Sequence, residues 1–128
     1  MMLSPGDQML NEQNCYEFLL NVLYPEGLKC PEGHLLPPGQ APHDRHRDPI
    51  FDYKCRCCGR VFNIFTGTVW NGTRYSCRKI VLILRGIMEG VPVVRLAVQL
   101  HIDRSHLQRR RRAIEQMIEK YLAPLEVE

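Results

Sequence analysis

Four residues in two short pairs have the types and the spacing of a metal site. The first pair is Cys30 and His34, in Cys-Pro-Glu-Gly-His, and the second is Cys55 and Cys58, in Cys-Arg-Cys-Cys-Gly. Zinc takes four sulfur or nitrogen ligands in a tetrahedron, and two ligand pairs separated by a loop are how a small chain holds one such ion. We therefore predict one structural zinc ion bound by Cys30, His34, Cys55 and Cys58.

The fourth ligand stays open at this point. Sites of this kind more often repeat Cys-x-x-Cys, and His43 or His46 in the intervening loop could bind in place of His34. Cys57 could replace one of its neighbours, but Cys55 and Cys58 have the usual two-residue gap, so Cys57 is treated as spare. The alternatives for the cysteines are buried apolar thiols or disulfides. No signal peptide is visible, so we expect a reducing, cytoplasmic location in which disulfides are rare.

Charge is distributed unevenly along the 128 residues. Residues 1–72 contain six Lys and Arg against eight Asp and Glu, whereas residues 73–128 contain eleven against six, which gives net charges of −2 and +5. A basic C-terminal half points to a polyanion, most simply nucleic acid, although a solubilising surface has the same composition. The longest apolar run, Ile80 to Leu84, is far too short to span a bilayer, so no membrane partner is expected.

The ligand pairs need short elements to position them. A helix capped by Asn11 or Asn14 and ended by Pro25 and Gly27 is expected before the first pair. Its apolar face would consist of Cys15, Phe18, Leu19, Val22 and Leu23. Cys15 is therefore expected in the core and not at the metal.

Between and after the ligands, the pattern predicts loops and short strands. The proline-rich segment 35–49 resists both helix and sheet pairing. Residues 50–54 and 61–64 alternate like two strands of a hairpin with the second ligand pair at its tip. Thr66-Gly67-Thr68 is expected to turn the chain, and Val69-Trp70 to form a third strand.

From Ser76 onward the apolar spacing becomes helical, and three helices are expected. Ser76 can cap the first, which Gly90 ends. Pro92 can occupy the first position of the second, which runs to Leu100. After a short break, Asp103 can cap the third. Two helices joined by so tight a turn are typical of a helix-turn-helix unit.

The predicted fold is a small α+β protein with four parts. An unstructured N-terminus (1–10) precedes an N-terminal helix and zinc ribbon of short antiparallel β hairpins (11–72). A three-helix helix-turn-helix unit (73–123) and a tail (124–128) follow. A chain of this length makes one domain or two very small ones, and the metal would supply folding energy that so small a core cannot.

In a helix-turn-helix unit, the first residues of the last helix reach base edges in the major groove. Here those residues are Arg104, Ser105, Gln108 and Arg109, which can all donate to bases or phosphates. Arg112 lies further along and is expected beside the phosphate backbone. The opposite side of this helix would pack through Leu107, Ile114, Met117, Ile118 and Tyr121. The alternative is an ordinary packing unit with a charged face.

These segments, in this order, resemble the N-terminal region of bacterial insertion-sequence transposases, in which a zinc ribbon precedes an RNase H-like nuclease domain. The resemblance covers residues 11–118 and rests on a few segments. They are Tyr24-Pro25-Glu26-Gly27, Cys30-Pro31, Tyr53-Lys54-Cys55-x-x-Cys58, Phe62, Thr66-Gly67-Thr68 and the helix-turn-helix pattern. The resemblance implies that the ribbon and the helices recognise the terminal DNA of the element.

The chain departs from that family in three places. His34 stands where a cysteine is usual. Arg110 and Arg111 stand where the family tends to be apolar, so either they extend outward from the core or the helix is rotated. The sequence stops at Glu128, before the place of the nuclease domain.

The leading interpretation is a zinc-stabilised, sequence-specific DNA-binding protein without catalytic activity, the recognition part of an insertion-sequence transposase. Four protein ligands would close the zinc site, and no Ser/His/Asp order, Gly-rich phosphate loop or carboxylate pair of convincing spacing is apparent. The expected partner is double-stranded DNA at element ends in the nucleoid, and a homodimer or a transposase partner chain stays open. Alternatives are a zinc-ribbon transcriptional regulator, a non-catalytic piece of a split transposase, and a protein-docking module.

Overall fold

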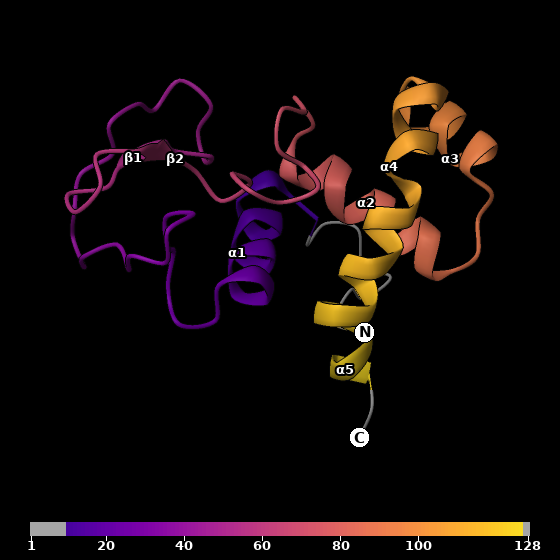
Figure 1. Ribbon diagram of the computed structural model, residues 1–128. Coiled ribbons are helices and arrows are strands. Elements are labelled where there is room, and N and C mark those ends of the chain that lie inside the picture. The colour runs from indigo at the N-terminus through magenta and orange to yellow at the C-terminus, as the bar shows by residue number, and fades with distance from the viewer. Residues whose placement is uncertain (1–9, 127–128) are drawn as a thin grey trace.

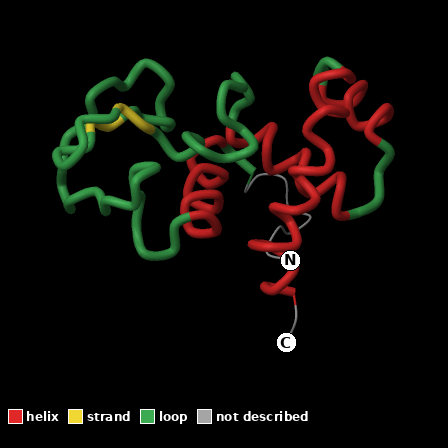
Figure 2. Tube along the Cα trace, in the orientation of Figure 1, coloured by secondary structure: helices red, strands yellow, loops and turns green. Residues whose placement is uncertain are grey.

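The computed structural model describes residues 10–126, which fold as a short hairpin beside a group of helices (Figure 1). The elements in chain order are α1 (Glu12–Leu23), β1 (Tyr53–Lys54), β2 (Val61–Phe62), α2 (Cys77–Met88), α3 (Val93–Leu100) and α4 (Arg104–Met117), with a π-helical turn η2 (Ile118–Leu122) and α5 (Ala123–Glu126) continuing α4. Loops make up most of the hairpin side and helices most of the other side (Figure 2). This arrangement confirms the predicted small α+β class in outline.

Helix α1 begins and ends where the sequence predicts. Asn11 is its N-cap, and the Asn11 side chain accepts a hydrogen bond from the Asn14 amide at 2.7 Å. The helix ends at Leu23, and Gly27 has a φ of +112°, in the region that favours glycine. Cys15 and Leu19 are buried on the inner face, so the prediction that Cys15 belongs to the core is confirmed.

The caps of the later helices follow the sequence closely. The Ser76 side chain accepts from the Lys79 amide at 3.1 Å, and the Asp103 side chain accepts from the His106 amide at 3.1 Å. Pro92 is the N-cap of α3 and not its first helical residue, a correction of one position. The turn from α3 to α4 is three residues long and passes through His101 in the left-handed conformation (φ +57°).

The sheet is smaller than predicted. Strands β1 and β2 pair antiparallel, with Tyr53 opposite Phe62 and Lys54 opposite Val61. The segments 50–54 and 61–64 were predicted as strands, and only two residues of each are paired. The predicted third strand at Val69-Trp70 is wrong, because those residues lie in a series of turns.

One hydrophobic core runs through the described residues, from Leu10 to Leu122. Helix α1 packs on α2, and α3 packs on both α2 and α4. Trp70 is fully buried, and its indole Nε1 donates to Met117 Sδ on α4 at 3.3 Å. The predicted unstructured segment 1–10 lies outside the described residues except for Leu10, which is buried.

A hydrogen-bonded junction joins the start of α1 to the start of α2. The Glu12 carboxylate accepts from the backbone amides of Cys77 (2.7 Å) and Arg78 (3.0 Å), the first two residues of α2. The Arg78 side chain donates back to the Leu10 carbonyl at 2.9 Å. Because the first amides of a helix have no partner within it, Glu12 supplies acceptors that α2 itself lacks.

Within residues 10–126, each helix is too short or too polar to cross a lipid bilayer.

Candidate metal centre and nucleic-acid interface

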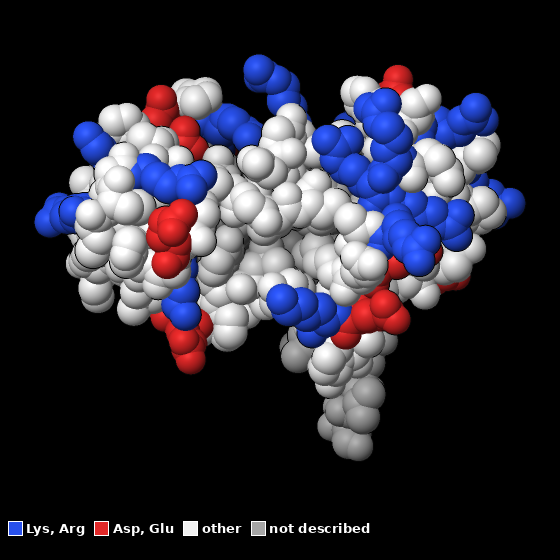
Figure 3. All heavy atoms as spheres, viewed as in Figure 1, with Lys and Arg blue, Asp and Glu red and all other residues white. Residues whose placement is uncertain are grey.

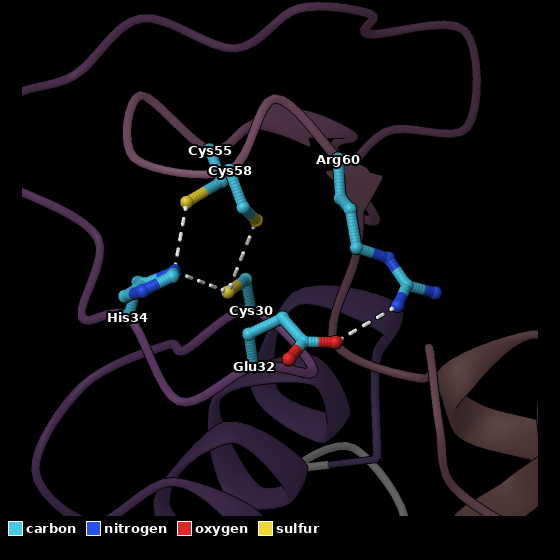
Figure 4. A network of polar contacts seen from close by, with 6 residues as sticks. All are labelled: Cys30, Glu32, His34, Cys55, Cys58 and Arg60. Atoms are coloured by element: carbon cyan, nitrogen blue, oxygen red, sulfur yellow. Dashed lines mark hydrogen bonds and ion pairs between the residues drawn. The ribbon is translucent and has the colours of Figure 1, made fainter.

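The four predicted ligands meet at one point between two turns (Figure 4). Nδ1 of His34 lies 3.3 Å from Cys30 Sγ and 3.5 Å from Cys55 Sγ, and Cys30 Sγ lies 3.8 Å from Cys58 Sγ. Tetrahedral ligands at the usual zinc bond lengths are separated by about 3.8 Å from sulfur to sulfur and about 3.6 Å from sulfur to nitrogen. All six cysteines are free thiols. The cluster therefore could hold one metal ion.

The first turn brings a histidine to the site in place of a second cysteine. An isolated bridge between Lys29 and Leu35 closes its base. The Gly33 amide donates to the Cys30 carbonyl at 2.8 Å, and the Cys30 amide donates to the His34 carbonyl at 3.0 Å. Gly33 has a φ of +91°, which a side chain would disfavour. Glycine thus occupies the position of the second cysteine in Cys-x-x-Cys, and the next residue, His34, reaches the cluster.

The second turn orients its thiols through backbone amides. The amides of Cys58 and Cys57 donate to the Cys55 sulfur, and these hydrogen bonds lower the pKa of Cys55 from 9.0 to about 6. The turn closes where the Cys55 amide donates to the Arg60 carbonyl at 2.8 Å. Hydrogen bonds to a ligand atom orient it and tune its basicity. The chain therefore favours the thiolate form of Cys55, which is the form that binds metal.

The structure selects among the ligands that the sequence left open. His43 and His46 are exposed and lie outside the cluster, and the His46 ring contacts the Asp44 carboxylate instead. Cys57 is exposed and also lies outside it. Among residues 10–126, the four ligands form the one group of Cys, His, Asp and Glu side chains with metal-binding spacing.

The surroundings of the cluster suit a structural role. Cys30 and Cys55 are buried, while Cys58 is at the surface. Arg60 Nη1 and Glu32 Oε2, 3.3 Å apart, form an ion pair that joins the two turns (Figure 4). With an ion bound, three thiolates and one imidazole would fill the four positions of a tetrahedron. Such a centre would hold the two turns together.

A second group of candidate residues lies on α4. Arg104, Ser105, Gln108, Arg109 and Arg112 are all exposed. Figure 3 shows Lys and Arg side chains gathered on the part of the surface formed by α3 and α4. The guanidinium groups of Arg104, Arg109 and Arg112 have no hydrogen-bond or ion-pair partner among the described residues. Their donors are therefore free to meet an external acceptor.

Four of these five residues share one depression. Arg104, Ser105, Gln108 and Arg109 line a shallow hollow of about 460 Å³, and Val94 of α3 completes its wall. Arg112 is not part of this hollow. The hollow thus groups four of the five predicted residues and leaves out Arg112. Val94 was not identified from the sequence. The buried side of α3 is supplied by other residues, Val93, Leu96 and Ala97, so Val94 is not needed there.

Charged side chains at the start and along the edge of α4 have defined partners. The His106 amide, which donates to Asp103 Oδ1, holds the pKa of Asp103 below its usual range, and the charge of Arg109 contributes in the same direction. Arg111 is exposed and pairs with Glu115 at 3.2 Å, so it extends outward from the core. Arg110 is half-buried, and its Nη1 donates to the His106 carbonyl at 3.4 Å. The departures from the apolar pattern are therefore accommodated at the edge of the core.

Comparison of the chain with protein-family models, with curated proteins and with solved structures found no match.

Proposed function

We propose that the protein is a zinc-stabilised, sequence-specific binder of double-stranded DNA, equivalent to the DNA-recognition part of an insertion-sequence transposase. The observation that carries the proposal is the hollow on α4, where four side chains with free donors face outward beside the short turn from α3. Hydrogen-bond donors in this arrangement match the acceptors that base edges present in the major groove.

Zinc is the metal that best fits the cluster. Thiolate and imidazole donors in a tetrahedron favour zinc over magnesium or calcium, which prefer oxygen ligands. The ligand atoms lie 3.3 to 3.8 Å from one another, which agrees with the edges of a tetrahedron built with zinc bond lengths. Because the hairpin contains only two residue pairs, the metal would supply much of the energy that holds the ligand turns.

The DNA-binding element would be a helix-turn-helix unit formed by α3 and α4. A left-handed residue, His101, allows the chain to reverse within three residues, and Asp103 then caps the recognition helix. Leu107 and Ile114 are fully buried, which fixes the rotation of α4 and leaves Ser105 and Arg112 on its outer face. Arginine can bind guanine through two hydrogen bonds worth about 1–3 kcal/mol against the wrong base.

No catalytic role is proposed for this chain. With an ion bound, the metal centre would have no open position, and two carboxylates beside the proposed DNA-binding helices pair with arginines: Glu115 of α4 with Arg111, and Glu89, the C-cap of α2, with Arg85. The protein would act on DNA in the cytoplasm, where thiols stay reduced. Cleavage or joining of strands would be the work of another domain or chain.

The proposal is tested by selecting bound duplexes from random DNA, with zinc and with a chelator present. We expect one short sequence to be enriched with zinc, weaker enrichment after chelation, and no magnesium-dependent nicking of the selected site. Recovery of no preferred sequence would refute the proposal. Nicking that disappears when an acidic residue of this chain is changed would refute its non-catalytic part.

Arginine variants separate base reading from general attraction. We expect Arg104→Ala and Arg109→Ala to lose affinity mainly for the selected site, because each would remove a base contact. Arg112→Ala should weaken binding to selected and scrambled duplexes alike and lower the salt slope by about one. Arg111→Ala is the control, since its side chain is occupied by Glu115. Equal losses on both duplexes for all variants would indicate only a basic helix.

A further inference from the structure

Two valines of α3 are exposed and lie outside the hydrophobic core. Val94 and Val98, one turn apart, are 53% and 72% exposed, whereas Val93, Leu96 and Ala97 supply the buried side of this helix. Single exposed apolar residues are common on protein surfaces and need no explanation by themselves. The two valines differ in their surroundings, however, and that difference points to a role for one of them.

Val94 lies in the hollow of α4, and Val98 does not. The hollow is lined by Val94 together with Arg104, Ser105, Gln108 and Arg109. It therefore combines four hydrogen-bonding side chains with one apolar patch contributed by a different helix. These residues favour a ligand that offers acceptors and an apolar group next to each other, and the positive charge of Arg104 and Arg109 favours an anionic one.

Thymine in a major groove has this combination. Its O4 is an acceptor and its 5-methyl group is apolar, and the two are attached to neighbouring ring atoms. The phosphates of the same duplex provide the negative charge. We propose that Val94 is a specificity-determining residue that receives the 5-methyl group of a thymine in the DNA sequence read by α4. This inference rests on the proposed function and adds a contact from α3 to it.

The contact has a defined size. One methyl group removed from water against a valine changes the dissociation constant about fourfold. The effect should be confined to one base position in each bound site, because a single valine faces the hollow. Phosphate contacts, in contrast, do not depend on which base is present.

The experiment replaces each thymine of the selected site, one at a time, with deoxyuridine, which lacks only the methyl group. Binding is measured for the zinc-loaded protein, for Val94→Ala and for Val98→Ala. At one position, deoxyuridine should weaken binding of the unmodified protein about fourfold. Val94→Ala should lose a similar factor on the thymine site and be insensitive to deoxyuridine there. Val98→Ala, the matched control, should respond as the unmodified protein does.

Both valines are exposed, and alanine is a better helix former, so both variants are expected to fold; their thermal unfolding in the absence of DNA checks this. One outcome would overturn this inference alone: a specific site is selected, but deoxyuridine at every position changes the binding of the unmodified protein and of Val94→Ala by the same factor. A selection that enriches no sequence would overturn the proposed function as well. A Val94→Ala loss that is equal on selected and scrambled DNA would also overturn the inference, because the valine would then contact sugar or phosphate.

Discussion

Gly86 in the last turn of α2 provides a sharp test of how the helices pack. On helix propensity alone, Gly86→Ala should stabilise the protein by about 1 kcal/mol. The structure opposes this gain, because an alanine Cβ would lie 2.6 Å from Leu96 Cδ1 and 3.1 Å from Leu96 Cδ2. Real Cβ atoms do not approach other atoms as closely as the first of these distances. Leu96 of α3 is itself 3% exposed and packs in the core, so it must change its packing to make room.

The larger effect decides the sign. Inserting a methyl group into a packed core costs about 1–3 kcal/mol, because a side chain must leave its rotamer or a helix must shift. Against a propensity gain of about 1 kcal/mol, we expect Gly86→Ala to lower the free energy of unfolding by about 1 kcal/mol. For a chain of this length, that corresponds to a fall in Tm of about 4 °C.

The assay is urea unfolding of the zinc-loaded protein, followed by circular dichroism, in a double-mutant cycle with Leu96→Ala. Without the leucine side chain the clash is absent, so Gly86→Ala in the Leu96→Ala background should be stabilising. Two results would refute the reasoning. One is an increase in stability for Gly86→Ala alone, and the other is an equal loss in both backgrounds, which would mean that Leu96 is not the obstacle.

Three further predictions concern the metal and the junction. Cys58→Ser should lose the zinc ion, while Cys57→Ser should retain one zinc per chain by elemental analysis; full zinc content in Cys58→Ser would exclude the ligand set. In the metal-free fold the pKa of Cys55 is lowered to about 6, so its contribution to stability is complete above its ordinary pKa near 9 and is lost as pH falls through 6. Because protons compete with zinc for the thiolates, zinc retention in a chelator competition should also fall as the pH is lowered, and constant retention from pH 8 to 5 would contradict this. Glu12→Gln should destabilise the protein by about 1–2 kcal/mol in urea, because the charged acceptor at two helix amides is lost; Glu17→Gln, an exposed change on the same helix, should shift stability by less than about 0.5 kcal/mol. Equal urea midpoints for these two variants would show that the junction contributes nothing.

Local chemistry made part of this fold predictable. Ser76 and Asp103 each cap the helix that the sequence assigns to them, and Asn11, one of two candidates, caps α1. In each case the side-chain oxygen and the amide it accepts from are within three residues. The ligand set was predictable for a related reason. Cysteine and histidine pairs at short spacing have few uses in a chain without disulfides, and the structure brings Cys30 and His34 to the second pair.

The failed strand at Val69-Trp70 shows where local reasoning ends. Two apolar residues are too few to establish a period of two. Polar side chains instead bind the nearby backbone: Thr68 Oγ1 donates to the Phe65 carbonyl at 2.7 Å, and the Phe65 amide donates to Asn63 Oδ1 at 2.8 Å. Such bonds compete with strand pairing and coil the chain into turns. Asn63 and Thr68 were visible in the sequence and could have suggested this.

Contacts between distant residues could not be predicted from one sequence. The Glu12 carboxylate meets an amide 65 residues away, and nothing in the local pattern distinguishes it from a solvated acid at the start of a helix. The approach of Leu96 to Gly86 likewise depends on the position of α3 against α2. The hollow that includes Val94 has the same origin, since its wall comes from two helices.

Trp70 gives the protein an optical reporter at its internal joint. It is the one tryptophan of the chain, it is fully buried, and it touches Met117 on α4 and the edge of Tyr75 at a ring distance of 6.4 Å. Its fluorescence therefore reports whether the turns after the hairpin are docked on the helices, and not whether the ligand turns are ordered. If removal of the metal loosens only the ligand turns, the emission of Trp70 should stay blue-shifted. If the turns around Trp70 separate from α4, the emission should move to the red. An unlabelled sample can thus distinguish loss of the ion from loss of the fold.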